Sequence, residues 1–249
     1  MFLFYVNPIL IAAAVIPAIV LLRFVYREDR LDKESPGMLL SLVLFGILAT
    51  FGALIAEQIG ESVLALLVPP YTRAYNAILY FVVVALSEEG FKYLLLKKRT
   101  WWSREFNCQF DGVVYAVFVS LGFALWENIS YVVMYGLGTA LVRAVTAIPG
   151  HACFGVFMGA FYGLAKRYDH FGDEYRSRRC RRLAVWVPVV LHGCYDYIAT
   201  YEYDGYAWIF VGFVVLLFAA AYRMIKRLAR DDRFIDGGDD YNFYNGPEL

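Results

Sequence analysis

Charged residues are scarce in this chain. Asp, Glu, Lys and Arg together account for 18% of its 249 residues, compared with about 25% in an average soluble domain. Hydrophobic residues account for 60%, a share that excludes an intrinsically disordered protein and an ordinary cytosolic enzyme. The 23 basic and 23 acidic residues cancel, so no net positive field attracts nucleic acid, and we expect no nucleic-acid partner.

Cysteine is also rare: the chain has four, and no two of them form a CxxC pair. This excludes a zinc knuckle, a thioredoxin-like motif and a secreted disulfide scaffold. The zinc-protease motif HExxH is missing as well. Cys153 and Cys194 each follow a histidine by two positions, but side chains at that spacing on a helix point about 200° apart. We therefore expect the cysteines to be packing residues rather than metal ligands.

Long apolar runs, by contrast, recur along the chain. Crossing a bilayer takes about 20 mostly apolar residues, and seven runs qualify: 2–22, 37–56, 74–96, 112–135, 143–165, 183–201 and 206–225. We predict an all-α, polytopic transmembrane bundle of about seven spans over residues 1–229, with its motif-bearing core at 74–201. The acidic stretch 230–249 predicts a flexible cytosolic tail. The short apolar piece Ser62–Val68, ended by two prolines, predicts an interfacial or re-entrant segment.

The basic residues predict how this bundle is oriented. Twenty of the 23 lysines and arginines follow the first, third, fifth and seventh runs; the other three are Arg73, Lys92 and Arg143. Cytoplasmic loops of membrane proteins carry an excess of Lys and Arg. We therefore expect an integral, multi-pass protein in a lipid bilayer, with its N-terminus outside and its C-terminus in the cytosol.

Ionisable side chains, and one asparagine beside them, occur within four neighbouring runs, the third to the sixth. They are Glu88, Glu89 and Lys92 in SEEGFK, Glu127 and Asn128 in GFALWEN, His151 in PGHACF, and His192 and Asp196 in LHGCYD. A charge inside the hydrocarbon is costly and by default marks a functional site. At helical spacing, Lys92 shares a face with both glutamates of its run. Asp196 in the same way lies beside His192. We expect these groups to converge.

A column of small residues continues from the histidine of the fifth run. Gly155, Gly159 and Gly163 follow His151 at intervals of four residues. Membrane helices approach each other closely over such columns. His151 is therefore expected to face another helix rather than lipid.

Taken together, these motifs resemble the PrsW family of intramembrane proteases over roughly residues 74–200. The resemblance rests on EExxK (Glu88–Lys92), Asp111-Gly112 with FxxxEN ending at Asn128, His151 with its glycines, and HxxxD (His192–Asp196). The series is also similar to that of CAAX prenyl protease and bacteriocin-immunity relatives, although Glu127 stands where those have a histidine.

The resemblance implies a function. It indicates an intramembrane endopeptidase of a prokaryotic cell membrane, which hydrolyses membrane-embedded or juxtamembrane protein substrates with a transmembrane segment. The family's best-known member makes the first, extracytoplasmic cut in an anti-sigma factor.

Eight residues are our candidates for the catalytic machinery: Glu88, Glu89, Lys92, Glu127, Asn128, His151, His192 and Asp196. We expect Glu88 to be the general base and Glu89 to tune it, because neighbouring carboxylates in a low dielectric oppose each other's ionisation. Asp196 would orient His192, Asn128 would help to hold the site, and Lys92 would balance charge.

The role of a metal stays open. The family's usual label implies a Zn²⁺ ion, held by Glu127, His151 and His192 with an open position for water. Alternatively, the two histidines donate hydrogen bonds to the oxyanion without a metal.

Two other functions use the same buried residues. A proton- or cation-coupled transporter also needs ionisable groups on facing helices, but the chain shows no inverted repeat. A purely structural role is the third possibility. Polar contacts between membrane helices average only about 0.6 kcal/mol in one well-studied case, so this many ionisable groups would be a poor choice for stability alone.

Overall fold

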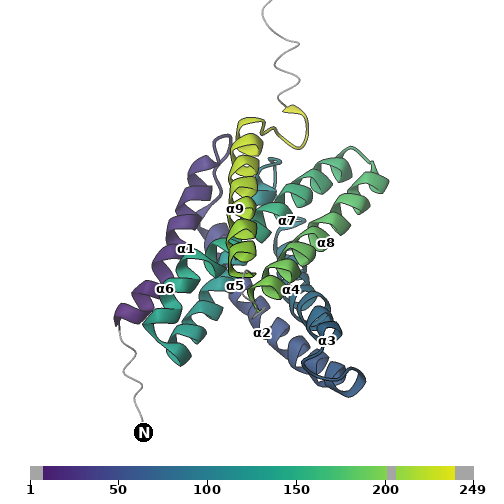
Figure 1. Ribbon diagram of the computed structural model, residues 1–249. Coiled ribbons are helices and arrows are strands. Elements are labelled where there is room, and N and C mark those ends of the chain that lie inside the picture. The colour runs from purple at the N-terminus through teal and green to yellow at the C-terminus, as the bar shows by residue number, and fades with distance from the viewer. Residues whose placement is uncertain (1–7, 201–205, 239–249) are drawn as a thin grey trace, which may run out of the picture.

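The computed structural model describes residues 8–200 and 206–238, and these residues are almost entirely helical (Figure 1). The elements are α1 (Pro8–Glu28), α2 (Pro36–Leu67), α3 (Arg73–Ile78), a π-helical segment η1 (Leu79–Val84), α4 (Ala85–Thr100), α5 (Asp111–Tyr135), α6 (Leu137–Val145), α7 (Ala147–His170), α8 (Glu174–Ala199) and α9 (Tyr206–Arg230). The only β-type pairing among the described residues is an isolated bridge between Cys108 and Phe234. The predicted all-α class is confirmed.

Four helical stretches are long and apolar enough to cross a bilayer. They are Pro36–Leu67, Asp111–Tyr135, Leu137–His170 and Tyr206–Arg230. The chain is therefore a multi-pass membrane protein. Helices α4 and α8, which carry most of the ionisable residues predicted for the site, are not among these four. Helix α4 has only 16 residues, and charged side chains lower the hydropathy of α8. The start of the first predicted run and the predicted tail beyond residue 238 lie outside the described residues.

The apolar piece Ser62–Val68 is not a separate segment, contrary to expectation. Helix α2 runs without a break to Leu67 and is 32 residues long. Glu57, Gln58 and Glu61 interrupt the apolar run but not the helix, because Glu and Gln are good helix formers. The helix ends at the two prolines that follow Val68, which have no backbone N–H to donate.

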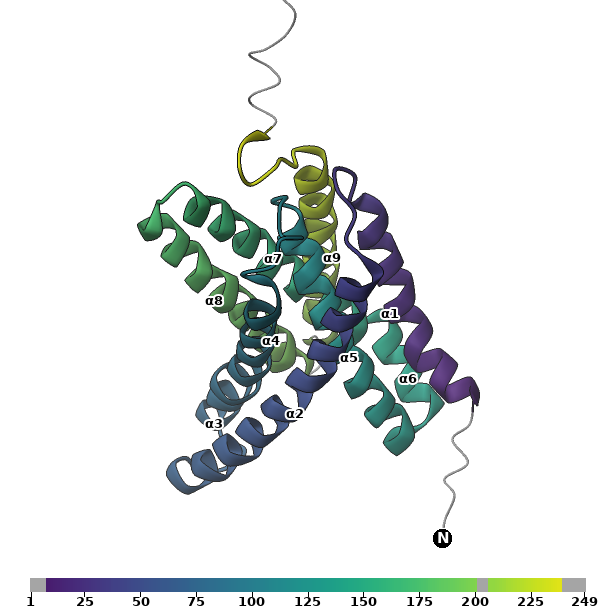
Figure 2. The same cartoon turned by 180° about the vertical axis from the view of Figure 1, so that it is seen from behind.

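Helix α5 lies at the centre of the bundle. Figures 1 and 2 show α1 and α6 on one side of it and α3, α4 and α8 on the other. Most of its side chains from Asp111 to Ala124 are buried, and α2 and α7 pack directly against it. At Gly159 and Gly163 a Cβ atom would overlap the α5 backbone or the residues just before it. The predicted close approach along this glycine column is confirmed.

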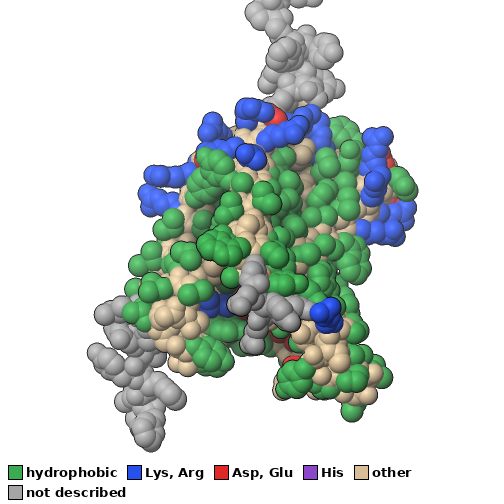
Figure 3. Space-filling model, in the orientation of Figure 1, with side chains coloured by type: hydrophobic (Ala, Val, Ile, Leu, Met, Phe, Trp, Pro, Cys, Tyr) green, Lys and Arg blue, Asp and Glu red, His purple; other side chains and the backbone are tan. Residues whose placement is uncertain are grey.

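Lysine and arginine side chains gather at one end of the molecule. In the view of Figure 3 most of them lie at the top, where the α1–α2 and α7–α8 connections and the end of α9 are found. Below them the surface is mostly hydrophobic. Such a band of apolar surface beside a basic end is the arrangement expected of a protein embedded in a bilayer.

Candidate functional site

The four motifs come together in one place. Glu88, Glu89 and Lys92 lie on α4, Glu127 and Asn128 on α5, His151 on α7, and His192 and Asp196 on α8. A cavity of about 410 Å³ opens beside them. Five of the eight candidates line it: Glu88, Glu127, His151, His192 and Asp196. The predicted convergence of four helices is thus what the structure shows.

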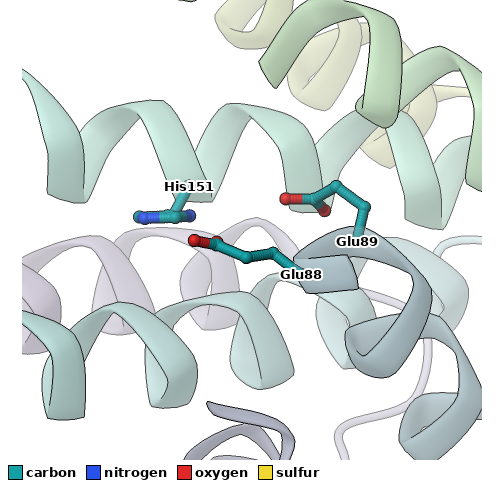
Figure 4. A group of neighbouring side chains, drawn as sticks. All are labelled: Glu88, Glu89 and His151. Atoms are coloured by element: carbon teal, nitrogen blue, oxygen red, sulfur yellow. The ribbon is translucent and has the colours of Figure 1, made fainter. Parts of the chain in front are cut away.

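Lys92 is the centre of the cluster. Its side chain is fully buried, and its ammonium lies 3.1 Å from Glu88 Oε2, 2.7 Å from Glu89 Oε1 and 3.1 Å from His151 Nδ1. Its charge also lies 4.1 Å from the centre of the Phe123 ring, a cation–π contact. In Figure 4 the Glu88 carboxylate reaches from α4 toward the His151 ring on α7. The three contacts use all three ammonium protons.

These contacts define the tautomer of His151. An ammonium can only donate, so the Nδ1 atom that faces Lys92 must accept. The ring proton is then on Nε2, which donates to Glu127 Oε2 at 2.9 Å. His151 is in this way a neutral bridge between a buried lysine and a carboxylate.

His192 lies between two carboxylates. Its Nδ1 is 2.9 Å from Glu89 Oε1, and its Nε2 is 3.3 Å from Asp196 Oδ2. The ring stacks on Phe154, with 4.7 Å between the ring centres. Carboxylates accept hydrogen bonds, so a doubly protonated imidazole satisfies both contacts. The contact predicted between His192 and Asp196 is confirmed.

Glu127 and Asn128 share a partner that the sequence analysis missed. Arg143, on α6, lies 3.1 Å from Glu127 Oε2 and donates from Nε to Asn128 Oδ1 at 3.1 Å. The guanidinium also covers the Tyr131 ring at 4.0 Å, and Asn128 donates to the Ala14 carbonyl of α1. In the sequence, Arg143 is only one of the three basic residues that do not follow the first, third, fifth or seventh run. Its presence at the start of an apolar run was the available signal.

Two further features of the site were missed. Glu57 of α2 lines the cavity, but the apolar run predicted for α2 stopped just before it. The π-helical segment η1 directly precedes α4 and contributes Tyr80 and Val84 to the cavity wall. Single π-helical turns are frequent at functional sites. Nothing in the apolar pattern distinguishes such a turn from α-helix.

The donor set is suited to a divalent metal. Ligand atoms of Glu88, Glu89 and His151 all lie within 4.8 Å of one another, the only such group among the described residues. The Oε2 atom of Glu89 is buried without a hydrogen-bond partner. Carboxylates and imidazole are ordinary ligands of Zn²⁺. Of the three residues predicted as ligands only His151 belongs to this group; Glu127 and His192 do not.

These observations define a class: a multi-pass membrane protein with a buried cluster of carboxylates and histidines beside a cavity. Residues 34–222 match the family of PrsW family intramembrane metalloproteases, and the chain therefore belongs to that family. It is an intramembrane protease. The match extends well beyond residues 74–200, where the motifs lie.

Curated relatives agree over nearly their whole length. The Protease PrsW of Halalkalibacterium halodurans is 30% identical over 226 residues, which cover 90% of this chain and 99% of the relative. The Protease PrsW of Geobacillus kaustophilus is 33% identical over 226 residues, which cover 88% of this chain and 91% of the relative. The Protease PrsW of Bacillus subtilis is 29% identical over 218 residues, which cover 88% of this chain and 94% of the relative. No solved structure is significantly similar to the chain.

Proposed function

We propose that this protease hydrolyses peptide bonds of membrane proteins at the cavity, with Glu88 as the general base. The observation that carries the proposal is the different placement of the two adjacent glutamates. Glu88 lines the cavity, whereas Glu89 is fully buried behind it and accepts from Lys92 and His192. Of these two glutamates, only Glu88 can reach a water molecule and a substrate in the cavity.

The other residues support this base. Glu88 takes a proton from the attacking water, and the Lys92 ammonium at 3.1 Å keeps the carboxylate charged until it does so. His192, whose Nδ1 lies 3.9 Å from Glu88 Oε2, is placed to pass a proton to the leaving amine. Asp196 orients the His192 ring. Glu127, which Arg143 holds together with Asn128, fixes His151.

In the metal-bound alternative that the family description implies, Zn²⁺ would be held by Glu88, Glu89 and His151, and Glu88 would then be a ligand rather than the free base. Such an ion polarises the scissile carbonyl and activates water. The ammonium of Lys92 lies among the same three side chains, so it and a metal would compete for them. Metal analysis of the pure, active protein tests this: one equivalent of zinc that is lost in His151→Ala supports it, and an active protein without metal supports the metal-free alternative.

The proposed topology has seven spans in one bundle over residues 1–229, with the N-terminus outside and residues 230–249 as a cytosolic tail. Arg143, near the end of α6, and Thr200, at the end of α8, line the cavity and lie away from the basic surface. The cavity would then open to the outer side of the membrane. This supports cleavage at an extracytoplasmic juxtamembrane bond, as in the first cut of an anti-sigma-factor type of substrate. Labelling of cysteines introduced at the two ends of the bundle tests the orientation.

The proposed activity is tested with the detergent-purified full chain and a panel of single-span membrane proteins. We expect Glu88→Gln to reduce cleavage by at least about 100-fold, the low end of the contribution of a general base. Glu61→Gln is the matched control, because Glu61 is an exposed glutamate of α2, and it should cleave normally. Cleavage that survives both Glu88→Gln and His192→Ala would overturn the site assignment.

A further inference from the structure

A second group of carboxylates lies at the basic end of the molecule, away from the cavity. It comes from the α1–α2 connection, the α4–α5 connection with the start of α5, and the segment after α9. Hydrogen bonds join the three segments. Asn107 donates to Asp32 at 2.7 Å, Tyr115 donates to Glu34 at 2.6 Å, and the Phe110 N–H donates to Asp232 at 2.8 Å.

Several oxygen atoms in this group are buried and have no partner. Asp29 is 1% exposed, and neither of its carboxylate oxygens accepts a hydrogen bond. Glu34 Oε2 and Asp111 Oδ1 are also buried without a hydrogen-bond partner; Glu34 is 5% exposed and Asp111 is 0% exposed. The side-chain oxygen of Asn107 is likewise buried without a partner. A buried carboxylate without a partner costs several kcal/mol in general. Something that the protein chain itself does not supply must offset this.

The charge of Lys33 lowers the pKa of Asp29, but less than burial raises it, and Lys33 makes no hydrogen bond to these carboxylates. The ammonium of Lys33 donates to the backbone carbonyls of Tyr26 and Asp29. Burial, with further repulsion from Asp232 and Asp32, raises the pKa of Asp29 to about 6. Burial likewise raises the pKa of Glu34 to about 8. Glu28 just before them differs, since Lys226 pairs with it at 2.5 Å.

We propose that these side chains bind a hard divalent cation, Mg²⁺ or Ca²⁺, through oxygen atoms of Asp29, Glu34, Asp111 and Asn107. All the available ligand atoms are oxygens, which these ions prefer and softer metals do not. Cys108 is no thiolate ligand, because burial and the surrounding carboxylates raise the pKa of its thiol. No three carboxylates here place ligand atoms within 4.8 Å of one another in the described chain. The three carboxylates therefore cannot all bind one ion directly, and the ion would keep water molecules between itself and some of them, as Mg²⁺ usually does.

The bound ion fastens the cytosolic end of the bundle. The α4–α5 connection is already tied to the segment after α9, because Gln109 N–H donates to the Arg233 carbonyl and Ile235 N–H to the Asn107 carbonyl. The ion adds the α1–α2 connection to this joint. Its effect is therefore on the stability of the whole chain, and it does not depend on the proposed function.

The test is the melting temperature of the full chain in detergent at pH 8, after removal of metals with a chelator. Saturating Mg²⁺ or Ca²⁺ should raise it by about 5 °C or more over Na⁺ at equal ionic strength. The larger rise in melting temperature identifies which of the two ions the site prefers. Asp29→Asn and Glu34→Gln should each lose most of this rise and melt higher than the wild type without divalent ions, since each removes a buried charge. Glu174→Gln, which removes an exposed carboxylate at the start of α8, should behave as the wild type.

Two outcomes would overturn the proposal. Equal melting temperatures with divalent ions and with Na⁺ would mean that protons alone neutralise the group. A rise that persists unchanged in the Asp29→Asn, Glu34→Gln double variant would place the binding elsewhere, for example at Glu88 and Glu89. Equilibrium dialysis with radioactive Ca²⁺, on wild type and double variant, counts the sites independently of melting.

Discussion

The ammonium of Lys92 lies 3.1 Å from Nδ1 of His151. This contact joins α4 to α7 through the middle of the site. It also occupies the ring nitrogen that would otherwise be free to bind a metal, because the other ring nitrogen already donates to Glu127. Lysine and metal are therefore alternative cations for one group of side chains.

The first prediction concerns this competition. Lys92→Met removes the ammonium and leaves two adjacent buried carboxylates. We expect it to bind Zn²⁺ at least about 10-fold more tightly than the wild type, because the competing cation is gone. Without metal it should be about 3–5 kcal/mol less stable, the usual cost of removing one partner of a buried ion pair. Zinc titration and denaturation in detergent measure the two effects.

Lys98→Met is the control for this variant, because Lys98 is an exposed lysine on the same helix. It should change neither zinc affinity nor stability. An unchanged or weaker zinc affinity in Lys92→Met would show that a metal, where it binds, uses other side chains, such as the predicted set of Glu127, His151 and His192.

The second prediction concerns Arg143, which we infer to be a positioning residue. Arg143→Gln removes the cation that holds Glu127 and Asn128. Loss of a hydrogen bond to a charged group costs about 1.5–3 kcal/mol, or roughly 10- to 100-fold in rate. We expect that loss in kcat with little change in KM, and partial recovery in Arg143→Lys. Arg73→Gln, at an exposed arginine near the same end of the bundle, should retain full activity; equal losses in both variants would contradict the assignment.

The fold was largely predictable from the sequence because membrane helices obey a simple length rule. Within the described residues every predicted run corresponds to a helix or to consecutive helices, although only four stretches are long and apolar enough to span a bilayer. The breaks within runs differ in how far they were predictable. The π-helical segment Leu79–Val84 lies in an apolar stretch without Gly or Pro, so nothing in the local pattern marks it. The break at Thr146 does have a signal, because Pro149 cannot donate a hydrogen bond to the carbonyl four residues before it and is tolerated only in the first turn of a helix.

The site was predictable where it depends on helical spacing and not where it depends on packing. Lys92 with its two glutamates, and His192 with Asp196, follow from positions three and four apart. The contact between Lys92 and His151 joins residues 59 positions apart. The contact between Arg143 and Glu127 depends on how α6 packs against α5. Such contacts are set by tertiary packing, which one sequence alone does not show.

The third prediction concerns the glycine column. At Gly159 an added Cβ would meet the backbone of α5 at Gly112 and Val113. Helix backbone cannot give way locally, so we expect Gly159→Ala to destabilise the protein by about 1–3 kcal/mol. Gly138→Ala is the matched control, because nothing lies within 4 Å of a Cβ there; it should be neutral or stabilise by up to about 1 kcal/mol. Melting temperatures in one detergent compare them, and equal values would mean that α5 and α7 are less closely packed.

The last prediction concerns how stability depends on pH when divalent ions are removed. Burial raises the pKa of Asp29 from 3.8 to about 6 and that of Glu34 from 4.5 to about 8. Carboxyl groups whose pKa is higher in the folded state favour folding while protonated. Their contribution is complete below about pH 4 and disappears as the pH rises through about 6 and then about 8. We therefore expect the melting temperature to fall across this range, and to fall less in Glu34→Gln, which cannot ionise.

Divalent ions should reverse this fall selectively. Protons and cations compete for the same oxygens, so Mg²⁺ or Ca²⁺ should raise the melting temperature strongly at pH 8 and hardly at pH 5. Melting curves of the wild type, Glu34→Gln and Glu174→Gln over this range, with and without the ions, separate the contributions. A pH dependence that is identical in all three proteins would show that Glu34 does not titrate in this range.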